Sequence, residues 1–312
     1  DLTVNDVAVL PGKIGITNGT GALTVNMKAA AVAGTSDTVN IELAGAQAGA
    51  DLSVTSDATG TSSIEAATIN SISAANTLTT LALDGAASLT VTGDQSLTLA
   101  QALASSVTTI DASGMNGAVG LTLSADPAAV AGVTITGSGG VDSLRGTTAG
   151  NDNISSGAGN DTITFATDGQ LNALDVVDGG AGTDTIVSAE NAVVASQLGG
   201  ISNVEKLSQT GAGTITLTEN VGPTTFVIGD TSDQTVTFND AYSNASTVSI
   251  IGDIGSADSI VNNSDIDLTV TARSTDLGPV AGSTAINMGG NLAAGTTTIV
   301  LDSTTGILAG TD

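Results

Sequence analysis

The stretch GSGGVDSLRGTTAGNDNISSGAGNDTITFATDGQLNALDVVDGGAGTDTIV, residues 137–187, repeats a pattern nine residues long. The pattern reads G-G-x-G-x-D-x-U-x, where U is an aliphatic residue. One copy, GGAGTDTIV, matches every specified position, and SGAGNDTIT misses only the first glycine. The five units are Gly137–Arg145, Thr147–Ser155, Ser156–Thr164, the eroded Gln170–Asp178, and Gly179–Val187. Because each unit keeps an aliphatic residue two positions after an aspartate, the stretch predicts a regular coil in which these aliphatic residues point inward.

The spacing of the aspartates gives the size of that coil. Asp152 and Asp161 are nine residues apart, as are Asp175 and Asp184, and Asp142 precedes Asp152 by ten. The gap from Asp161 to Asp175 is 14 residues, so roughly five residues are inserted there. Two units make one coil of about 18 residues, and alternate units stack on one edge. We therefore predict an all-β parallel β-helix, or β-solenoid, in which Asp142 lies beside Asp161.

Glycine and aspartate at these positions suit calcium sites between successive turns. Glycine permits positive φ angles and leaves backbone carbonyls open to a cation. Aspartate adds a charged oxygen, and calcium takes about 6–8 oxygen ligands. One such turn in a chain with 40 glycines can be an ordinary aspartate turn, but copies in phase favour several bound Ca²⁺ ions. The candidate ligands are Asp142, Asp152, Asp161, Asp175, Asp184, Gly140, Gly150, Gly157, Gly159, Gly180 and Gly182.

Outside the repeat, the chain consists of short runs in which Thr or Ser alternates with an aliphatic residue, as in Leu78–Leu83. The runs start roughly ten residues apart with turn residues between them, which predicts many short strands. Short helical segments are expected at residues 97–104 and 190–198, where Ala, Gln and Leu replace Thr. We predict three regions: a β-strand-repeat solenoid at 1–135, a calcium β-roll at 136–190, and a second β-strand-repeat solenoid at 191–312.

The composition excludes several classes of function. The chain carries 31 acidic and five basic residues, a formal net charge of −26, and no basic stripe that would bind nucleic acid. Anionic lipid or polysaccharide would need a bridging divalent cation. Zero Cys and zero His remove disulfides, thiol chemistry and the commonest general base. No apolar run is long enough for a transmembrane helix. Because the chain starts at Asp1 without an apolar leader, we expect a processed or partial chain.

The nonapeptides resemble the RTX (repeats-in-toxin) family of calcium β-rolls, and more narrowly the calcium-dependent S-layer proteins of Gram-negative bacteria. The phrases Val107–Asp126 and Gly200–Leu217 are similar to strand repeats of such surface-layer proteins. The resemblance implies a structural, non-enzymatic protein, exported by type I secretion and located outside the cell. It would self-assemble on the cell surface into a calcium-stabilised lattice. The implied partners are copies of itself and cell-surface polysaccharide, held through calcium or an anchor.

Two alternatives remain open. An RTX adhesin or biofilm matrix protein would share the calcium roll, the acidity and the strand repeats. A polysaccharide-active β-helix enzyme is more remote, because the basic, histidine and aromatic residues of such sites are almost absent. The segments GTSDTV and GSADSI resemble the repeat more weakly and make Asp37 and Asp258 further candidate ligands. A plain turn is the simpler interpretation of both segments.

Overall fold

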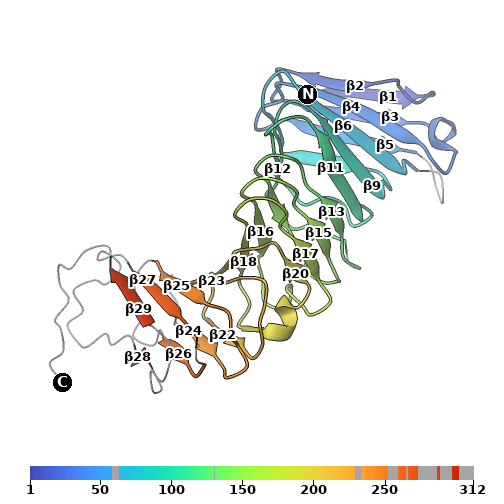
Figure 1. The fold of residues 1–312 in the computed structure, drawn as a ribbon. Helices are drawn as coiled ribbons and strands as arrows, with labels where there is room; N and C mark the ends of the chain where they lie inside the picture. Colours follow the sequence, from blue (N-terminus) through green and yellow to red (C-terminus); the bar gives the residue numbers. More distant parts are fainter. Residues whose placement is uncertain are drawn as a thin grey trace, which may run out of the picture. The chain divides into compact units, whose positions relative to one another are not determined.

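Alternation of small polar and aliphatic residues makes the strands, because successive side chains of a strand point to opposite faces. In the computed structural model nearly all regular structure is β-strand, and the strands stack in parallel as a β-solenoid (Figure 1). The predicted all-β parallel solenoid is thus confirmed. The structure describes residues 1–57, 63–129, 131–228, 233–251, 259–264, 266–272, 287–288 and 297–301. It divides into two units, Asp1–Thr164 with Val176–Asp184, and Phe165–Asp175 with Thr185–Asp312.

The first unit holds three parallel sheets. Their strand orders are β1-β3-β5-β8, β2-β4-β6-β9-β11-β13-β15-β17 and β7-β10-β12-β14-β16. The strands and one short 3₁₀ helix are β1 (Leu2–Val7), β2 (Ile14–Thr17), β3 (Ala22–Met27), η1 (Ala29–Val32), β4 (Thr38–Ala44), β5 (Asp51–Ser56), β6 (Ala66–Ile72), β7 (Asn76–Leu78), β8 (Thr80–Leu83), β9 (Ser88–Gly93), β10 (Leu97–Leu99), β11 (Thr109–Met115), β12 (Leu121–Leu123), β13 (Thr134–Thr136), β14 (Ser143–Arg145), β15 (Asn153–Ser155), β16 (Thr162–Phe165) and β17 (Val176–Asp178).

The second unit contains two parallel sheets, with the strand orders β18-β21-β23-β25-β27-β29 and β19-β22-β24-β26-β28. Its elements are β18 (Thr185–Ser188), β19 (Ala192–Val194), η2 (Ala195–Leu198), β20 (Ile201–Ser202), β21 (Lys206–Gln209), β22 (Gly213–Leu217), β23 (Thr225–Ile228), β24 (Gln234–Phe238), β25 (Ser246–Ile250), β26 (Ser259–Asn262), β27 (Leu268–Ala272), β28 (Asn287–Met288) and β29 (Thr297–Leu301). Inside this unit the ring of Phe238 packs against Phe226 and Tyr242, with ring centroids 5.6 and 5.2 Å apart.

The core is a set of columns in which aliphatic side chains stack on their own kind. Leu97 of β10 lies in register with Leu121 of β12, and Leu144 of β14 with Ile163 of β16. The aliphatic residues that follow the repeat aspartates, predicted to point inward, are all fully buried: Leu144, Ile154, Ile163, Val177 and Ile186. Each buried aliphatic side chain removes apolar surface from water, so the columns hold the coils together.

The coil is longer than the predicted 18 residues. Asp142 and Asp161 are stacked neighbours 19 residues apart, and Asp161 and Asp184 are stacked neighbours 23 residues apart. The longer coil contains the residues predicted as an insertion between Asp161 and Asp175. The extra residues lie between β16 and β17, outside the strands, so the columns keep their register.

The predicted helical segments are wrong in one case and partly right in the other. Leu97–Leu99 is strand β10, because Leu97 and Leu99 alternate with Thr98 and stack on Leu121 and Leu123 of the next coil. In the segment 190–198, only Ala195–Leu198 is helical, as a single 3₁₀ turn, and Ala192–Val194 is strand β19. Column packing therefore outweighs the local helix preference of Ala, Gln and Leu.

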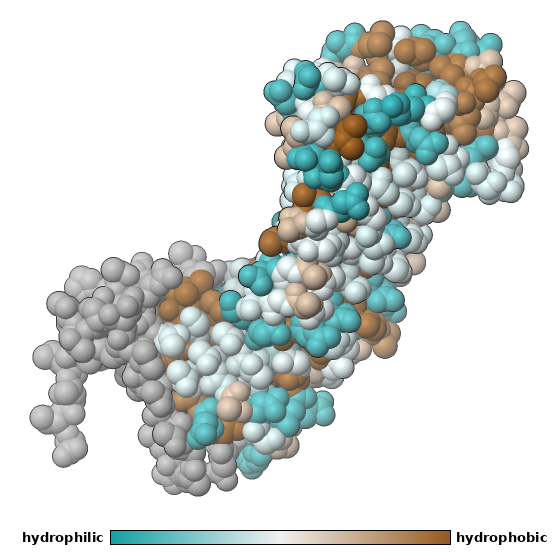
Figure 2. Space-filling model, turned by 45° about the horizontal axis from the view of Figure 1, so that its top comes forward, coloured by the Kyte–Doolittle hydropathy of each residue, from teal (hydrophilic) through white to brown (hydrophobic). Residues whose placement is uncertain are grey.

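Apolar side chains are exposed over the first strands of the first unit, where brown surface gathers in Figure 2. Leu2, Val4 and Val9 are 60%, 40% and 76% exposed. β1 is the last strand of its sheet among the described residues, so only one of its edges is paired there. Within the described part of the chain, no helix has the length and apolar character needed to span a membrane.

Candidate functional site

The five repeat aspartates occupy equivalent positions, each directly before a short strand. Asp142, Asp161 and Asp184 precede β14, β16 and β18. The other two, Asp152 and Asp175, precede β15 and β17. Because the strand alternates, an aspartate here directs its carboxylate into the corner of the coil while the residue two places later fills the core.

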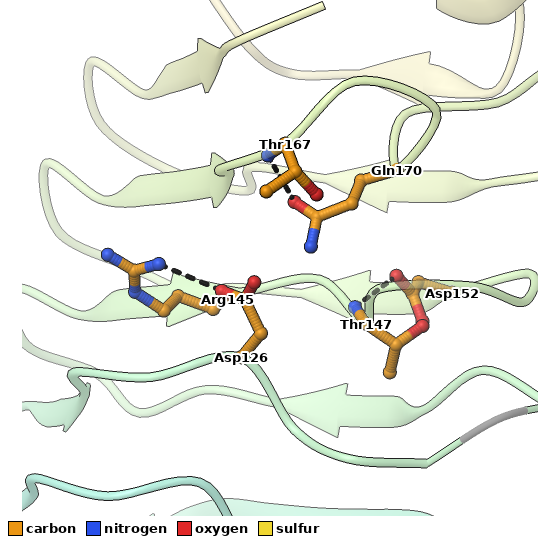
Figure 3. Close-up of polar contacts among 6 residues, drawn as sticks. All are labelled: Asp126, Arg145, Thr147, Asp152, Thr167 and Gln170. Carbon is orange, nitrogen blue, oxygen red and sulfur yellow. Dashed lines mark hydrogen bonds and ion pairs between the residues drawn. The ribbon is translucent and has the colours of Figure 1, made fainter.

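All five carboxylates are buried, with the whole residue 0–2% exposed: Asp142, Asp152, Asp161, Asp175 and Asp184. Aspartate is almost never fully buried unless its charge is compensated. The only basic residue within 137–187 is Arg145, and it forms its ion pair with Asp126 at 2.8 Å (Figure 3). The repeat therefore buries several carboxylates, while its one basic side chain, Arg145, is paired with an aspartate outside the repeat.

A hydrogen-bond ladder joins the carboxylates of successive coils. The backbone N–H of Asp142 donates to Oδ1 of Asp161 at 2.8 Å, and the N–H of Asp161 donates to Oδ1 of Asp184 at 2.8 Å. The expected pairing of Asp142 with Asp161 is confirmed. Asp152 likewise accepts a hydrogen bond from the coil before it, from the N–H of Val133 to Oδ1 at 2.9 Å. Asp142, which accepts the N–H of Leu121, and Asp152, Asp161 and Asp184 thus each satisfy a backbone donor of the preceding coil.

Donors from within the same turn reach three of the carboxylates. The backbone N–H of Ser138 donates to Oδ2 of Asp142 at 2.7 Å, and that of Thr147 donates to Oδ2 of Asp152 at 2.8 Å (Figure 3). The Thr147 hydroxyl adds a 2.8 Å hydrogen bond to Oδ1 of Asp152. For Asp175, the donors are the backbone N–H and the side-chain amide of Asn172, at 2.7 and 3.1 Å. These three turns are closed by the protein's own hydrogen bonds.

The turn that ends at Asp161 differs from those three. Ser156 sends its backbone N–H to the carbonyl of Asp178 at 2.9 Å and its hydroxyl to the carbonyl of Gly179 at 2.7 Å. Both donors therefore point into the next coil. Oδ2 of Asp161 is buried and has no hydrogen-bond partner in the described part of the chain. A buried carboxylate oxygen without a donor is costly and is suited to a cation.

Burial also changes the acidity of these groups. Desolvation raises the pKa of Asp161 above its ordinary value of 3.8, although the backbone N–H of Asp142 and the nearby Ser156 side chain act against it. Desolvation likewise raises the pKa of Asp142, where the charge of Asp161 adds to the effect and the donors Leu121 and Ser138 oppose it. A nearby cation would favour the ionised forms and lower both pKa values.

The glycines allow backbones of successive coils to touch. A Cβ at Gly182 would overlap the carbonyl oxygen of Gly159, and one at Gly180 would overlap that of Gly157. Gly180 and Gly182 also have φ of +83° and +146°. The remaining candidate glycines leave equally little space for a Cβ against the preceding coil: Gly140, Gly150, Gly157 and Gly159. Carbonyl oxygens are therefore concentrated between the turns, where a hard cation can use them.

Other acidic residues have local explanations. Asp37 accepts the N–H of Gly34 at 3.0 Å, as in an ordinary turn, and its own N–H donates to Glu65 at 2.7 Å. Asp258 lies outside the described residues. Among the described residues, no three His, Cys, Asp or Glu side chains converge into a cluster that could hold a metal by themselves. A cation at the repeat would therefore need backbone carbonyls as well as carboxylates.

Glu190 is a buried acid that the sequence pattern did not predict. Glu190 is 2% exposed and accepts the N–H groups of Gly169 and Leu171 at 2.7 and 2.8 Å. Burial raises its pKa, and the neighbouring Asp168 adds to the rise. Asp168 itself has a lowered pKa because Asn191 donates to it. Glu190 lies six residues after Asp184, out of phase with the nine-residue pattern, so the pattern contained no signal for it.

Comparison with known proteins identifies no relative: no family model matches the chain, and no curated protein or solved structure is significantly similar to it.

Proposed function

We propose that this chain is a structural, non-enzymatic protein of the cell surface, whose solenoid is stabilised by calcium and which self-assembles with copies of itself into an S-layer lattice. The observation that carries this proposal is the set of buried aspartates in phase with the coil, including the unpartnered Oδ2 of Asp161. Buried carboxylates in a chain of formal net charge −26 call for bound cations.

The residues at the turns fit calcium. Aspartate carboxylates and the carbonyls of the glycine turns are hard oxygen ligands, which Ca²⁺ prefers. Bound there, calcium would neutralise carboxylate charge and link neighbouring coils. Asp161, Asp184 and the carbonyls of the glycines between them would hold it, together with the other repeat aspartates where their hydrogen bonds permit. The acidic repeat would then be stable only while calcium is present at sufficient concentration.

The aromatic residues support a structural protein over a polysaccharide-active enzyme. The chain has only four aromatic residues. Phe165, Phe226, Phe238 and Tyr242 are all buried, at 0–1% exposure, so none offers a ring face on which a sugar could stack. The chain also contains no His or Cys that could serve as a general base or a nucleophile.

The charge supports a calcium-dependent encounter between copies. Two surfaces of the same strongly negative chain repel each other within about one Debye length, roughly 8 Å at physiological salt. A divalent cation between the copies removes that repulsion, and the same bridge would hold anionic cell-surface polysaccharide. The proposed location outside the cell, reached by type I secretion, rests on the resemblance of the nonapeptides to RTX proteins.

Calcium titration of the full chain tests the proposal. Metal-free protein is titrated to millimolar calcium, and the same samples are followed by circular dichroism melting and by electron microscopy. A higher unfolding temperature together with ordered two-dimensional sheets, both reversed by a chelator, is the expected result. Stabilisation without sheets would favour the adhesin or biofilm matrix protein. No response in either measurement would overturn the calcium-dependent structural role.

A further inference from the structure

The repeat turns fall into two classes by the way their carboxylates are satisfied. In the turns that end at Asp142, Asp152 and Asp175, each carboxylate oxygen accepts at least one hydrogen bond from the protein. In the turn that ends at Asp161, only Oδ1 does so. The difference follows from Ser156, whose two donors reach the next coil.

A cation bound at the first class of turn would have to compete with those donors. If the carboxylate of Asp152 moved to a metal, the N–H groups of Val133 and Thr147 would lose their acceptor, and the Thr147 hydroxyl would keep only the carbonyl of Ala149. Buried donors without an acceptor are costly, and this cost subtracts from the binding free energy. At Asp161, Oδ2 can meet a cation while Oδ1 keeps the N–H of Asp142.

The turn stacked on that of Asp161 is also the one that matches the nonapeptide in full. Gly179–Asp184 has no hydroxyl or amide side chain at its first two positions, where the other four units carry Ser138, Thr147, Ser156 and Gln170. The turns of Asp161 and Asp184 pack backbone on backbone, with reciprocal hydrogen bonds from the N–H of Ala181 to Gly157 and from the N–H of Gly159 to Ala181. The carbonyls of Gly157 and Ala181 thus lie in the same two stacked turns as the unpartnered carboxylate oxygen.

We propose that the repeat has a single tight calcium site, formed by the turns Ser156–Asp161 and Gly179–Asp184 around Oδ2 of Asp161, and that the other three turns close without metal. The inference rests on the proposed calcium-dependent function. It reduces the expected number of calcium ions bound to the repeat from several to one. Ser138, Thr147 and Asn172 take the place of calcium in their turns, since they supply the hydrogen bonds that hold the carboxylates there.

Binding stoichiometry tests the inference on the full 312-residue chain. Metal-free protein is titrated with calcium chloride by isothermal calorimetry, and bound ions are counted by native mass spectrometry. One tight ion per chain is expected. Asp161→Asn should weaken that site by about tenfold or more, because it loses a charged oxygen ligand. Asn retains an oxygen acceptor for the N–H of Asp142, so the metal-free variant should still fold.

Asp152→Asn is the matched control, because it makes the same change at a turn whose two oxygens are already hydrogen-bonded. It should leave the tight site unchanged. Hydrogen exchange of the wild-type chain provides a readout that needs no variant: calcium should slow exchange at 156–161 and 179–184, and leave 137–155 unaffected.

The outcomes separate this inference from the function on which it rests. Two or more equally tight ions, equal losses in both variants, or protection spread over 137–155 would overturn the single site while calcium remains the ligand. A wild-type chain that binds no calcium would overturn both.

Discussion

The backbone N–H of Asp142 donates a 2.8 Å hydrogen bond to Oδ1 of Asp161, 19 residues further along the chain. The two aspartates are the same position of successive coils, and Asp161 stands in the same relation to Asp184. A residue that sequence reasoning assigns to a metal is therefore also a structural acceptor for the coil before it. This double role decides what substitutions and pH do to the protein.

Without calcium, the protein should be most stable on the mildly acidic side. Burial raises the pKa of Asp142 and Asp161 above 3.8. A carboxyl with a higher pKa in the folded than in the unfolded chain favours folding below the unfolded value and opposes it as pH rises through the folded value. The unfolding temperature of metal-free protein should therefore fall as pH rises from about 4 towards 7. Calorimetry over this range checks the slope, which should be smaller in Asp142→Asn and in saturating calcium. A steady rise with pH in the metal-free chain would contradict this assignment.

Loss of one column residue should be costly. Leu144→Ala removes a fully buried side chain that lies in register with Ile163, and should lower the free energy of unfolding by about 2–5 kcal/mol. Chemical denaturation at fixed calcium concentration measures the change. Val141→Ala, at a residue 64% exposed three positions earlier, is the control and should stay within about 0.5 kcal/mol of the wild type. Similar losses in both variants would mean that the columns do not carry the stability.

A methyl group at Gly182 should disrupt the stacking of the turns. The added Cβ would overlap the carbonyl of Gly159, at a φ of +146° that only glycine adopts readily. Gly117→Ala separates strain from overlap, because Gly117 has a φ of +75° and nothing within 4 Å of its added Cβ. It should cost about 1–2 kcal/mol, and Gly182→Ala clearly more. Thermal melts of both variants give the comparison, and equal losses would argue against close contact between these turns.

The hydroxyl of Thr147 should contribute measurably to stability. Thr147→Val keeps the shape of the side chain but removes the donor to Oδ1 of Asp152, and should cost about 1–3 kcal/mol. Thr148→Val makes the same change at the exposed neighbour and should have little effect. Denaturant titrations of the two variants provide the test. An unchanged Thr147→Val would show that the backbone N–H of residue 147 suffices to hold the carboxylate.

The sequence predicted those features that depend on period and spacing. An aliphatic residue two positions after each aspartate was enough to place Ile154 and Ile163 in the core, and the spacing of units was enough to stack Asp142 on Asp161. The roles of Ser138, Thr147 and Ser156 were not predicted. In the template these residues count only as departures from glycine, whereas in the fold their donors decide which carboxylate oxygen has no partner.

The sequence pattern also did not predict two features that are set by tertiary packing. Leu97–Leu99 has the composition of a short helix and becomes a strand because Leu121 and Leu123 of the next coil pair with it. Glu190 is buried by the turn that contains Gly169 and Leu171, within and just after the inserted residues, and no spacing in the sequence indicates that contact.

The change of coil length from 19 to 23 residues without loss of register has a consequence for how such a chain can be altered. Strand Asn153–Ser155 pairs in full with Val176–Asp178, although the segment between Phe165 and Val176 is longer than its counterpart one coil earlier. The corner between β16 and β17 therefore tolerates a variable number of residues. A foreign peptide grafted at Asp168–Gly169 would be displayed on the solenoid while the strands on either side kept their partners, provided that Gly169 and Asp168 keep their hydrogen bonds with Glu190 and Asn191. This corner is therefore a point of attachment for an engineered epitope or enzyme.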